Sequence, residues 1–443
     1  MISDKFANPF GDALKVALEK KSSSRFQPKV NLGQRNKDVQ VIVGLDFGTS
    51  YTKAYCNIQG DIFPIEFSTV PDSKFYLPSI VYYDAIGKNL SINEKPNFSR
   101  INYFKYNMIN DELRTQHEGH SGVTFDELCS AFFLANVIQK IKNIAVQKRP
   151  GVNLNFHINM GCPIANEDSR FKGIYNKALN VAYVISHMPN IETMNLGKIA
   201  EYYKAHSSKM NPALRTVPEL YAEALWFIEK SSTDSGIYAI LDIGGGTIDY
   251  ATIVINFDTG IKKTCIYSQG AKPLGVEILL KKIYPHDYKN NRDKCLEELR
   301  NSNIRIPSHS REKPLVEEQY IQGNAFEILF FQGVKDVKDI SPRLMQYQYT
   351  EKGSIPYYTF GGGSDINWFH SIINQHNEFI TTAGIPHLQK KHVDTELPHN
   401  RLIVAYQLSQ PTLPDVGKYP WEFKKHNQEA YNPEIPSYLL IDD

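Results

Sequence analysis

The sequence predicts an α/β fold built from two related halves. Short apolar runs typical of strands alternate with segments of helical periodicity, which is the order of elements in α/β proteins. A strand that ends in an acidic residue and a glycine-containing turn occurs at 41–53 and again at 237–249. The chain has 443 residues, and at about 150 residues per domain this length corresponds to two or three domains.

The predicted strands are recognised by their apolar pattern. Residues 41–45 form a short continuous apolar run, as expected for a strand buried on both faces. Residues 152–160 alternate between apolar and polar side chains, which is the period of a half-exposed strand. Residues 237–243 and 250–257 flank a glycine cluster and predict a hairpin, and 355–360 predict a strand that runs into glycines.

The predicted helices are recognised by apolar residues at helical spacing. Thr124 and Glu127 form the T-x-x-E pattern of a capping box, and a helix is expected from there to about residue 147. Pro218 fits the start of a second helix that extends to about residue 230, because Pro is tolerated in the first turn. The remaining helices are expected at 6–20, after Gly275 and after the glycines at 361–363.

Composition argues against several classes of protein. With 49 basic and 48 acidic residues the net charge is +1 at pH 7, which disfavours a generally basic nucleic-acid-binding protein. No apolar run reaches the roughly 18–20 residues of a membrane span, and the first residues lack the apolar core of a signal peptide. The five cysteines contain no CxxC pair, which is typical of buried, reduced thiols. We therefore expect a cytoplasmic protein without a membrane span.

The first candidate phosphate-binding segment is the turn after the strand at 41–45. This strand ends in Asp46, whose carboxylate suits a hydrated Mg²⁺, because that ion keeps most of its waters and needs only one or two carboxylates. The turn that follows contains Gly48, Thr49, Ser50 and Tyr51. Its backbone N–H groups and hydroxyls are the donors that phosphate oxygens require.

Two further glycine turns follow later in the chain. Asp242 repeats the position of Asp46, and the turn after it contains Gly244, Gly245, Gly246 and Thr247, where glycine lets the backbone close on a phosphate. The third turn contains Gly361, Gly362, Gly363, Ser364 and Asp365 and would let an adenosine lie flat against the backbone. One such turn alone is commonly a tight turn, but three at strand ends predict a nucleotide site. No Walker A or GxGxxG signature competes with this interpretation.

These turns resemble the first phosphate, second phosphate and adenosine motifs of the actin-like ATPase superfamily, which includes actins, DnaK-type 70-kDa heat-shock chaperones and sugar kinases. The resemblance extends over about residues 41–409 and is best with the DnaK-type branch. The other segments that resemble this branch are 77–83, 161–163, 218–224, 274–277 and 402–409.

The resemblance implies a two-lobed actin-like ATPase fold. Each lobe would be built on a ribonuclease-H-like mixed sheet flanked by helices, with the nucleotide in the cleft between the lobes. The expected divisions are an N-terminal extension at 1–39, lobe I at 40–235, lobe II at 236–409 and a Pro- and aromatic-rich tail at 410–443. Either terminal segment is a candidate docking site for a partner protein.

The resemblance also implies roles for the site residues. Asp46, Asp242 and Glu219 would hold Mg²⁺ through water. Lys105, Thr247 and Asp249 would complete the catalytic set, with Thr247 nearest the γ-phosphate and Asp249 orienting the attacking water. ATP or ADP would contact the residues of the three turns together with Gly275 and Glu277.

The chain departs from the DnaK-type pattern in two respects. The adenosine motif of that family carries an Arg that stacks on adenine, whereas Ser364, Asp365 and Ile366 supply no basic residue there. Arg311 and Lys313 are candidates for the basic helix that clamps the adenosine. Residues 410–443 are also too few for a peptide-binding domain and lid, so we expect an ATPase module without its own substrate domain.

The leading hypothesis is a slow, partner-stimulated, Mg-dependent ATPase that acts as a conformational switch on another protein. The main alternative is a self-assembling, filament-forming actin-like protein of the plasmid-segregating or cell-shape kind. A small-molecule kinase on the same fold would carry a sugar-kinase signature, which the sequence lacks. A pseudo-ATPase is disfavoured because Asp46, Glu219, Asp242 and Thr247 are all present.

Overall fold

The computed structural model describes most of the chain between residues 38 and 301 and shorter segments after it. The described residues are 38–70, 73–108, 122–163, 169–209, 211–229, 236–258, 261–272, 275–284, 286–301, 355–366, 369, 380–384 and 399–411. The chain divides into two units, Met1–Lys37 and Asp38–Asp443, and all described residues belong to the second. The predicted helix at 6–20, nearly all of the tail, Arg311 and Lys313 lie outside the described residues.

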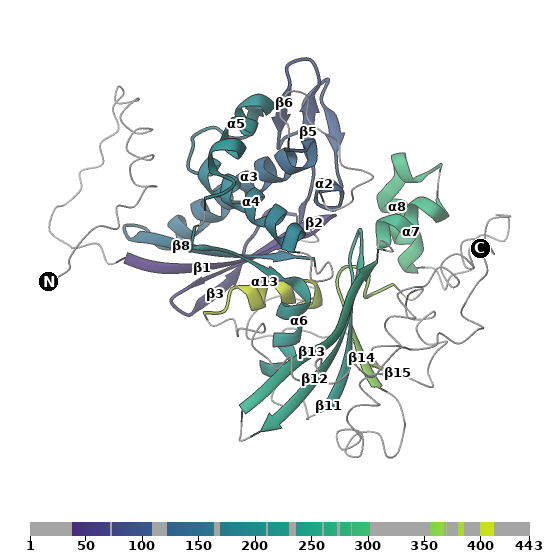
Figure 1. Ribbon diagram of the computed structural model, residues 1–443. Coiled ribbons are helices and arrows are strands. Elements are labelled where there is room, and N and C mark those ends of the chain that lie inside the picture. Colours follow the sequence, from purple (N-terminus) through teal and green to yellow (C-terminus); the bar gives the residue numbers. More distant parts are fainter. Residues whose placement is uncertain are drawn as a thin grey trace, which may run out of the picture. The chain divides into compact units, whose positions relative to one another are not determined.

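The first sheet is mixed, with the strand order β10-β8-β1-β2-β3 and with β4 paired to β2 (Figure 1). β1 lies parallel to β8 and antiparallel to β2, so it is a central strand. Val41, Val43 and Leu45 of β1 are buried, as the continuous apolar run predicts. The strands are β1 (Asp38–Phe47), β2 (Tyr51–Ile58), β3 (Asp61–Pro64), β4 (Leu77–Pro78), β8 (Asn153–Cys162) and β10 (Leu214–Pro218).

The second sheet repeats the topology of the first. Its order is β15-β14-β11-β12-β13, and β11 lies parallel to β14 and antiparallel to β12. The outer pairs match as well, because β10 and β15 are parallel to their neighbours and β3 and β13 are antiparallel to theirs. The strands are β11 (Gly236–Ile243), β12 (Ile248–Asp258), β13 (Ile261–Lys272), β14 (Ile355–Phe360) and β15 (Ile380–Gly384). The protein is therefore α/β, and the halves predicted from the repeated motif share one sheet topology.

Two helices, α3 (Phe125–Lys148) and α4 (Ser169–Ile185), pack beside the first sheet, and α5 (Leu196–His206) packs on these helices (Figure 1). All three share a buried core with the sheet. The capping box at the start of α3 is confirmed, because Thr124 and Glu127 each accept the backbone N–H of the other. A small antiparallel sheet has the order β7-β5-β6-β9. Its strands are β5 (Val81–Asp84), β6 (Asn89–Ser91), β7 (Ser99–Ile101) and β9 (Thr193–Asn195), and β7 is followed by α2 (Phe104–Asn107).

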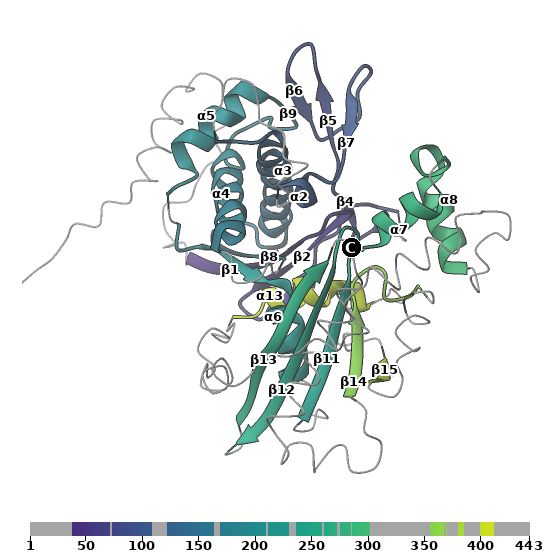
Figure 2. The same cartoon turned by 45° about the vertical axis from the view of Figure 1, so that its right-hand side comes forward.

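Two helices lie between the two large sheets, as Figures 1 and 2 show. α6 (Glu219–Glu229) follows β10, and α13 (Ile403–Leu408) follows the 3-10 helix η4 (His399–Leu402). One core cluster combines side chains from β2, α6, β11, β12, β14 and α13, so both sheets pack on these helices. Gly44 of β1 is needed for this packing, because a Cβ there would collide with the backbone of α13 at Ala405.

The helix prediction after Gly275 is confirmed, whereas the one after the glycines 361–363 falls mostly outside the described residues. α7 (Val276–Ile283) begins directly after Gly275, and α8 (Tyr288–Asn301) follows it. Residues 361–365 form turns and Ile366 is not helical, whereas Phe369 is helical, and the other residues of the predicted helix lie outside the described part of the chain. The N–H of Gly363 donates to Ile243 O of β11 at 2.9 Å, which holds the turn against the second sheet.

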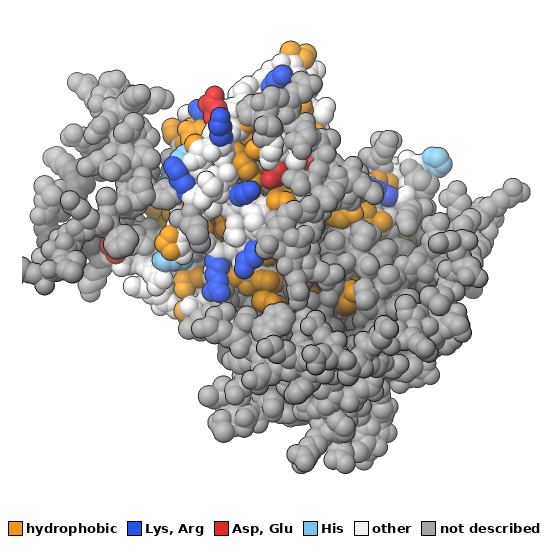
Figure 3. Space-filling view, viewed as in Figure 1, with side chains coloured by type: hydrophobic (Ala, Val, Ile, Leu, Met, Phe, Trp, Pro, Cys, Tyr) orange, Lys and Arg blue, Asp and Glu red, His pale blue; other side chains and the backbone are white. Residues whose placement is uncertain are grey.

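Two features of the described surface bear on possible partners. Among the described residues, no helix combines the length and the apolar character needed to cross a bilayer. On the face drawn in Figure 3, the Lys and Arg side chains are scattered among apolar and other groups. Among the described side chains on that face, the basic groups do not gather into one continuous patch.

Candidate functional site

The three glycine turns and their predicted companions meet in one pocket. The predicted residues that line it are Asp46, Gly48, Thr49, Ser50, Tyr51, Lys105, Glu219, Asp242, Gly244, Gly245, Thr247, Asp249, Glu277, Gly361 and Gly362. Gly246, Gly275, Gly363, Ser364 and Asp365 belong to the same segments but do not line the pocket. Its space is about 830 Å³ with the open solvent at its mouth included.

The first two turns close hairpins of the same geometry. β1 and β2 pair as far as Phe47 and Thr52, and β11 and β12 pair as far as Ile243 and Ile248, so four residues, 48–51 and 244–247, form each loop. In each loop the first glycine lies so close to the carbonyl of the fourth residue that a Cβ would contact that oxygen. The matching loops therefore bring Asp46 and Asp242 to equivalent positions, each one residue before the last pair.

The start of α7 is bonded to the second turn. The N–H groups of Gly275, Val276 and Glu277 donate to the carbonyls of Gly246, Gly244 and Gly245 at 3.2, 3.0 and 2.8 Å, respectively. A Cβ on Gly275 would collide with the backbone of Gly245, so only glycine permits this approach. These bonds place Glu277 next to the turn, where its side chain lines the pocket.

Three carboxyl groups form a cluster in the pocket. One oxygen of each of Glu219, Asp242 and Asp249 lies within 4.8 Å of the other two. Burial, together with the charges of Glu219 and Asp46, raises the pKa of Asp242 to about 7. Burial raises the pKa of Asp249 well above its usual value, and the charge of Asp242 adds to this effect. Like charges at this spacing require protons or a cation, and carboxylate oxygens are the ligands that Mg²⁺ prefers.

Glu223 adds a fourth carboxyl group, which the sequence patterns did not single out. It lies one helical turn after Glu219 on α6 and is fully buried. No N–H group or hydroxyl among the described residues donates to its oxygens, and the carboxyl group of Asp242 lies within hydrogen-bonding reach. Burial raises the pKa of Glu223 well above its usual value, and the charge of Asp242 adds to this effect. The i, i+4 spacing from Glu219 is the signal that could have identified it.

Two lysines neutralise part of this charge. Lys105 Nζ donates to Glu219 Oε1 at 2.8 Å, and Lys53 Nζ donates to Asp46 Oδ2 at 2.5 Å. Burial by itself lowers the pKa of Lys105, but the charge and hydrogen bond of Glu219 outweigh it, and the pKa is raised. Lys105 is thus a buried site residue and not an ordinary surface lysine, whereas Lys53, the cross-strand neighbour of Asp46, was not predicted. Two of the acids, Asp46 and Glu219, are thus paired with a lysine. The other three, Glu223, Asp242 and Asp249, have no lysine paired with them among the described residues.

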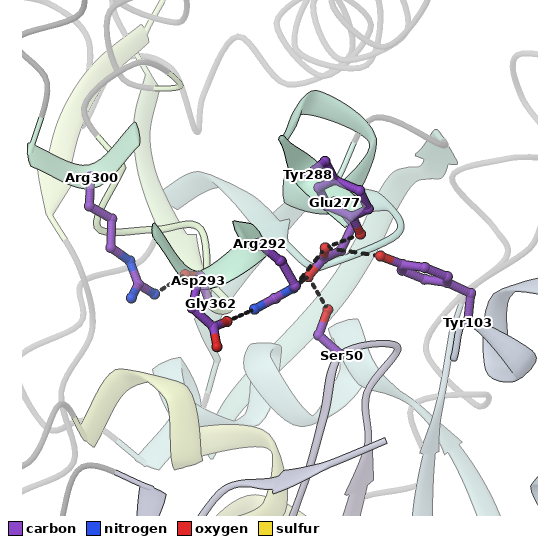
Figure 4. Close-up of polar contacts among 8 residues, drawn as sticks. All are labelled: Ser50, Tyr103, Glu277, Tyr288, Arg292, Asp293, Arg300 and Gly362. Carbon is purple, nitrogen blue, oxygen red and sulfur yellow. Dashed lines mark hydrogen bonds and ion pairs between the residues drawn. The ribbon is translucent and has the colours of Figure 1, made fainter. Parts of the chain in front are cut away.

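Glu277 is the centre of a second cluster, the Glu277 network, formed with Ser50, Tyr103, Tyr288 and Arg292 (Figure 4). Glu277 Oε1 accepts from Ser50 Oγ at 3.0 Å, and Oε2 accepts from the hydroxyls of Tyr103 and Tyr288 at 3.1 and 2.7 Å. Arg292 donates to both oxygens. Ser50 and Tyr103 come from the first half of the chain and the other members from α7 and α8, so the network joins both halves at the pocket.

Two arginines that the motifs do not contain lie at the third turn. Arg300 of α8 donates to Gly362 O at 3.5 Å and pairs with Asp365 at 3.4 Å. The Arg401 guanidinium lies 4.4 Å from the centre of the Tyr76 ring, and a Cβ on Gly362 would meet Arg401 Nη2 at 3.3 Å. The 364–366 segment itself lacks a basic residue, but Arg300 and Arg401, which are distant in sequence, bring positive charge to the third turn.

Comparison with known proteins gives no family assignment. No protein-family model matches the sequence, and no curated protein matches it significantly. The resemblance to actin-like ATPases therefore stays a prediction, and the function is inferred from the residues and geometry of the pocket.

Proposed function

We propose that this chain binds ATP with Mg²⁺ in the pocket and hydrolyses it slowly, as a DnaK-like conformational switch that acts on a partner protein in the cytoplasm. The observation that carries the proposal is that the turns after β1, β11 and β14, which are distant in sequence, line one pocket together with the acidic cluster. The duplicated sheet topology and the helices between the sheets support an actin-like arrangement of two ribonuclease-H-like lobes.

The donor set of the pocket fits a divalent cation. Glu219 and Asp242 belong to the acidic cluster, and Asp249 contributes an oxygen, Oδ1, that has no hydrogen-bond partner among the described residues. These three groups would hold Mg²⁺ directly or through water. Asp46, which the family pattern assigns to the same ion, is neutralised by Lys53 and would contribute through a water molecule. When bound, Mg²⁺ supplies charge neutralisation to the phosphates.

The residues of the chain have distinct tasks in the proposed hydrolysis. The backbone N–H groups of the two four-residue loops and the hydroxyls of Thr49 and Thr247 orient the phosphates. Lys105 offsets negative charge that develops on the transferred phosphoryl group. Asp249 orients the water that attacks in line, since phosphoryl transfer depends mainly on positioning and charge stabilisation.

Release of inorganic phosphate from ATP tests this proposal. Wild-type protein should release phosphate only when Mg²⁺ is present, Asp46→Asn should be inactive, and Thr247→Ala should be inactive but should still bind ATP. Asp61→Asn is the matched control, because Asp61 is an exposed residue that pairs with Arg149 on the surface. Wild-type turnover in both site variants would overturn the proposal.

A further inference from the structure

Arg292 lies in the pocket but belongs to none of the sequence motifs. It lines the pocket from α8, which has a non-helical residue, Asn291, directly before it. The Arg292 side chain is 19% exposed, so its guanidinium is accessible from the pocket. Its Cζ lies 5.9 Å from the centre of the Tyr51 ring in the first turn.

The guanidinium of Arg292 lies where the two phosphate turns approach each other. Arg292 and Ser50 donate to the same atom, Glu277 Oε1. A Cβ on Gly245 of the second turn would collide with Ser50 Oγ and would lie 3.5 Å from Glu277 Cγ. Arg292 therefore shares its hydrogen-bond partner Glu277 with the first loop, and Glu277 also lies next to the second loop.

The present partners of Arg292 can release it. Glu277 accepts hydrogen bonds from three hydroxyls in addition to Arg292, while a carboxylate has about four acceptor sites. Without Arg292, Glu277 would still have the hydroxyls of Ser50, Tyr103 and Tyr288. The second acid on Arg292, Asp293, is 90% exposed, and an ion pair of that kind contributes little to stability.

We propose that Arg292 is a phosphate-binding residue that transfers part of its hydrogen bonding from Glu277 to a phosphoryl oxygen of the bound nucleotide. This inference rests on the proposed function. A guanidinium suits the task, because its planar fork binds two phosphate oxygens at once. Arg300 and Arg401 are placed differently, since both lie at the third turn beside Gly362.

The test compares how much the phosphate chain adds to affinity in wild type and in Arg292→Ala. Equilibrium titration with adenosine, ADP and ATP in the presence of Mg²⁺ gives the ratio of nucleotide affinity to adenosine affinity. We expect Arg292→Ala to reduce this ratio by at least about tenfold, as for a lost charge-assisted hydrogen bond, and to leave adenosine affinity within about twofold. Arg292→Lys, which keeps the charge and loses the fork, should recover only part of the ratio.

Arg149→Ala is the matched control, because it removes an arginine that forms an exposed ion pair with Asp61 and does not line the pocket. It should leave the ratio unchanged. An equal loss of adenosine and ATP affinity in Arg292→Ala, an unchanged ratio, or the same selective loss in Arg149→Ala would each overturn the inference while wild type still binds ATP. Failure of wild type to bind ATP would instead overturn the proposed function.

Discussion

The hairpins β1–β2 and β11–β12 share the same strand pairing and loop length but differ in the charge of the residue opposite their aspartate. Both close with four-residue loops, and both carry an aspartate one residue before the last pair. Asp46 faces Lys53 across the first hairpin, whereas Asp242 faces Asp249 across the second. The first aspartate is neutralised at 2.5 Å, while the second joins an acidic cluster and has its pKa raised to about 7 by burial and by neighbouring charges.

One cross-strand residue therefore decides what a repeated motif can do. From the motif alone, Asp46 and Asp242 are equivalent candidates for Mg²⁺. In the structure, the three-carboxyl cluster contains Asp249 in addition to Glu219 and Asp242, and it does not contain Asp46. We infer that the acidic groups of the second hairpin attract a cation. The first hairpin does not, because Lys53 already neutralises Asp46.

The largest expected effect on stability comes from removing the lysine that neutralises Asp46 in the first hairpin. Lys53→Met leaves the carboxylate of Asp46 buried without its cation, and breaking such a pair from one side costs about 3–5 kcal/mol of unfolding free energy. Urea denaturation at pH 7 measures this loss. The double variant Lys53→Met/Asp46→Asn should regain most of the lost unfolding free energy. A loss below about 1 kcal/mol in the single variant would show that Asp46 does not depend on Lys53 for neutralisation.

The pH dependence of stability should report the second hairpin. The pKa of Asp242 is raised from an ordinary 3.8 to about 7, so the folded chain binds more protons than the unfolded chain between these values. Stability contributed by this proton is complete below about pH 4 and is lost as the pH rises to about 7, by at most about 4 kcal/mol. Urea denaturation without divalent cations should show this decrease, and Asp242→Asn should flatten it. An equally steep decrease in the variant would refute the assignment.

A smaller effect of opposite sign is expected at Asp249. Asp249→Asn removes a like charge from the cluster, so we expect the unfolding free energy without Mg²⁺ to rise by about 1–2 kcal/mol at pH 8. The same variant should gain less thermal stability from added Mg²⁺ than wild type does. A destabilised variant with full Mg²⁺ response would show that Asp249 is a structural residue.

The smallest expected effect on stability comes from a surface ion pair outside the pocket, which serves as the reference for the other variants. Asp61→Asn breaks the exposed pair with Arg149, whose two side chains are 47% and 53% exposed. Such pairs contribute less than about 1 kcal/mol. Denaturation should therefore place this variant within that range of wild type, and a larger loss would mean that charge pairs outside the pocket also govern stability.

Local patterns predicted the elements of this fold that depend on near neighbours in sequence. The capping box identified the start of α3, the apolar run identified β1, and the glycines at 244–246 identified the hairpin of the second half. The turn at 361–365, before the helix that was expected there, is held by a backbone bond from Gly363 to Ile243, more than a hundred residues earlier. Local periodicity contains no information about such a distant bond.

The motifs also identified the residues of the pocket that lie within the turns. They missed Lys53, Arg292 and Arg401, which reach the pocket through strand register or from helices outside the turns. They also missed Glu223, which lies behind the pocket lining next to Asp242. The sequence held a signal for Glu223, in its spacing from Glu219, and none for Arg401, whose place beside Gly362 depends on how α13 packs.

The most direct test of the central claim is calorimetric titration of wild-type protein with ATP, in Mg²⁺ and again in EDTA, alongside Asp242→Asn. The account predicts saturable binding of one ATP per chain in Mg²⁺, at least tenfold weaker binding in EDTA, and no difference between the two conditions in Asp242→Asn. Absence of binding at millimolar ATP, or equal wild-type affinity with and without Mg²⁺, would contradict it.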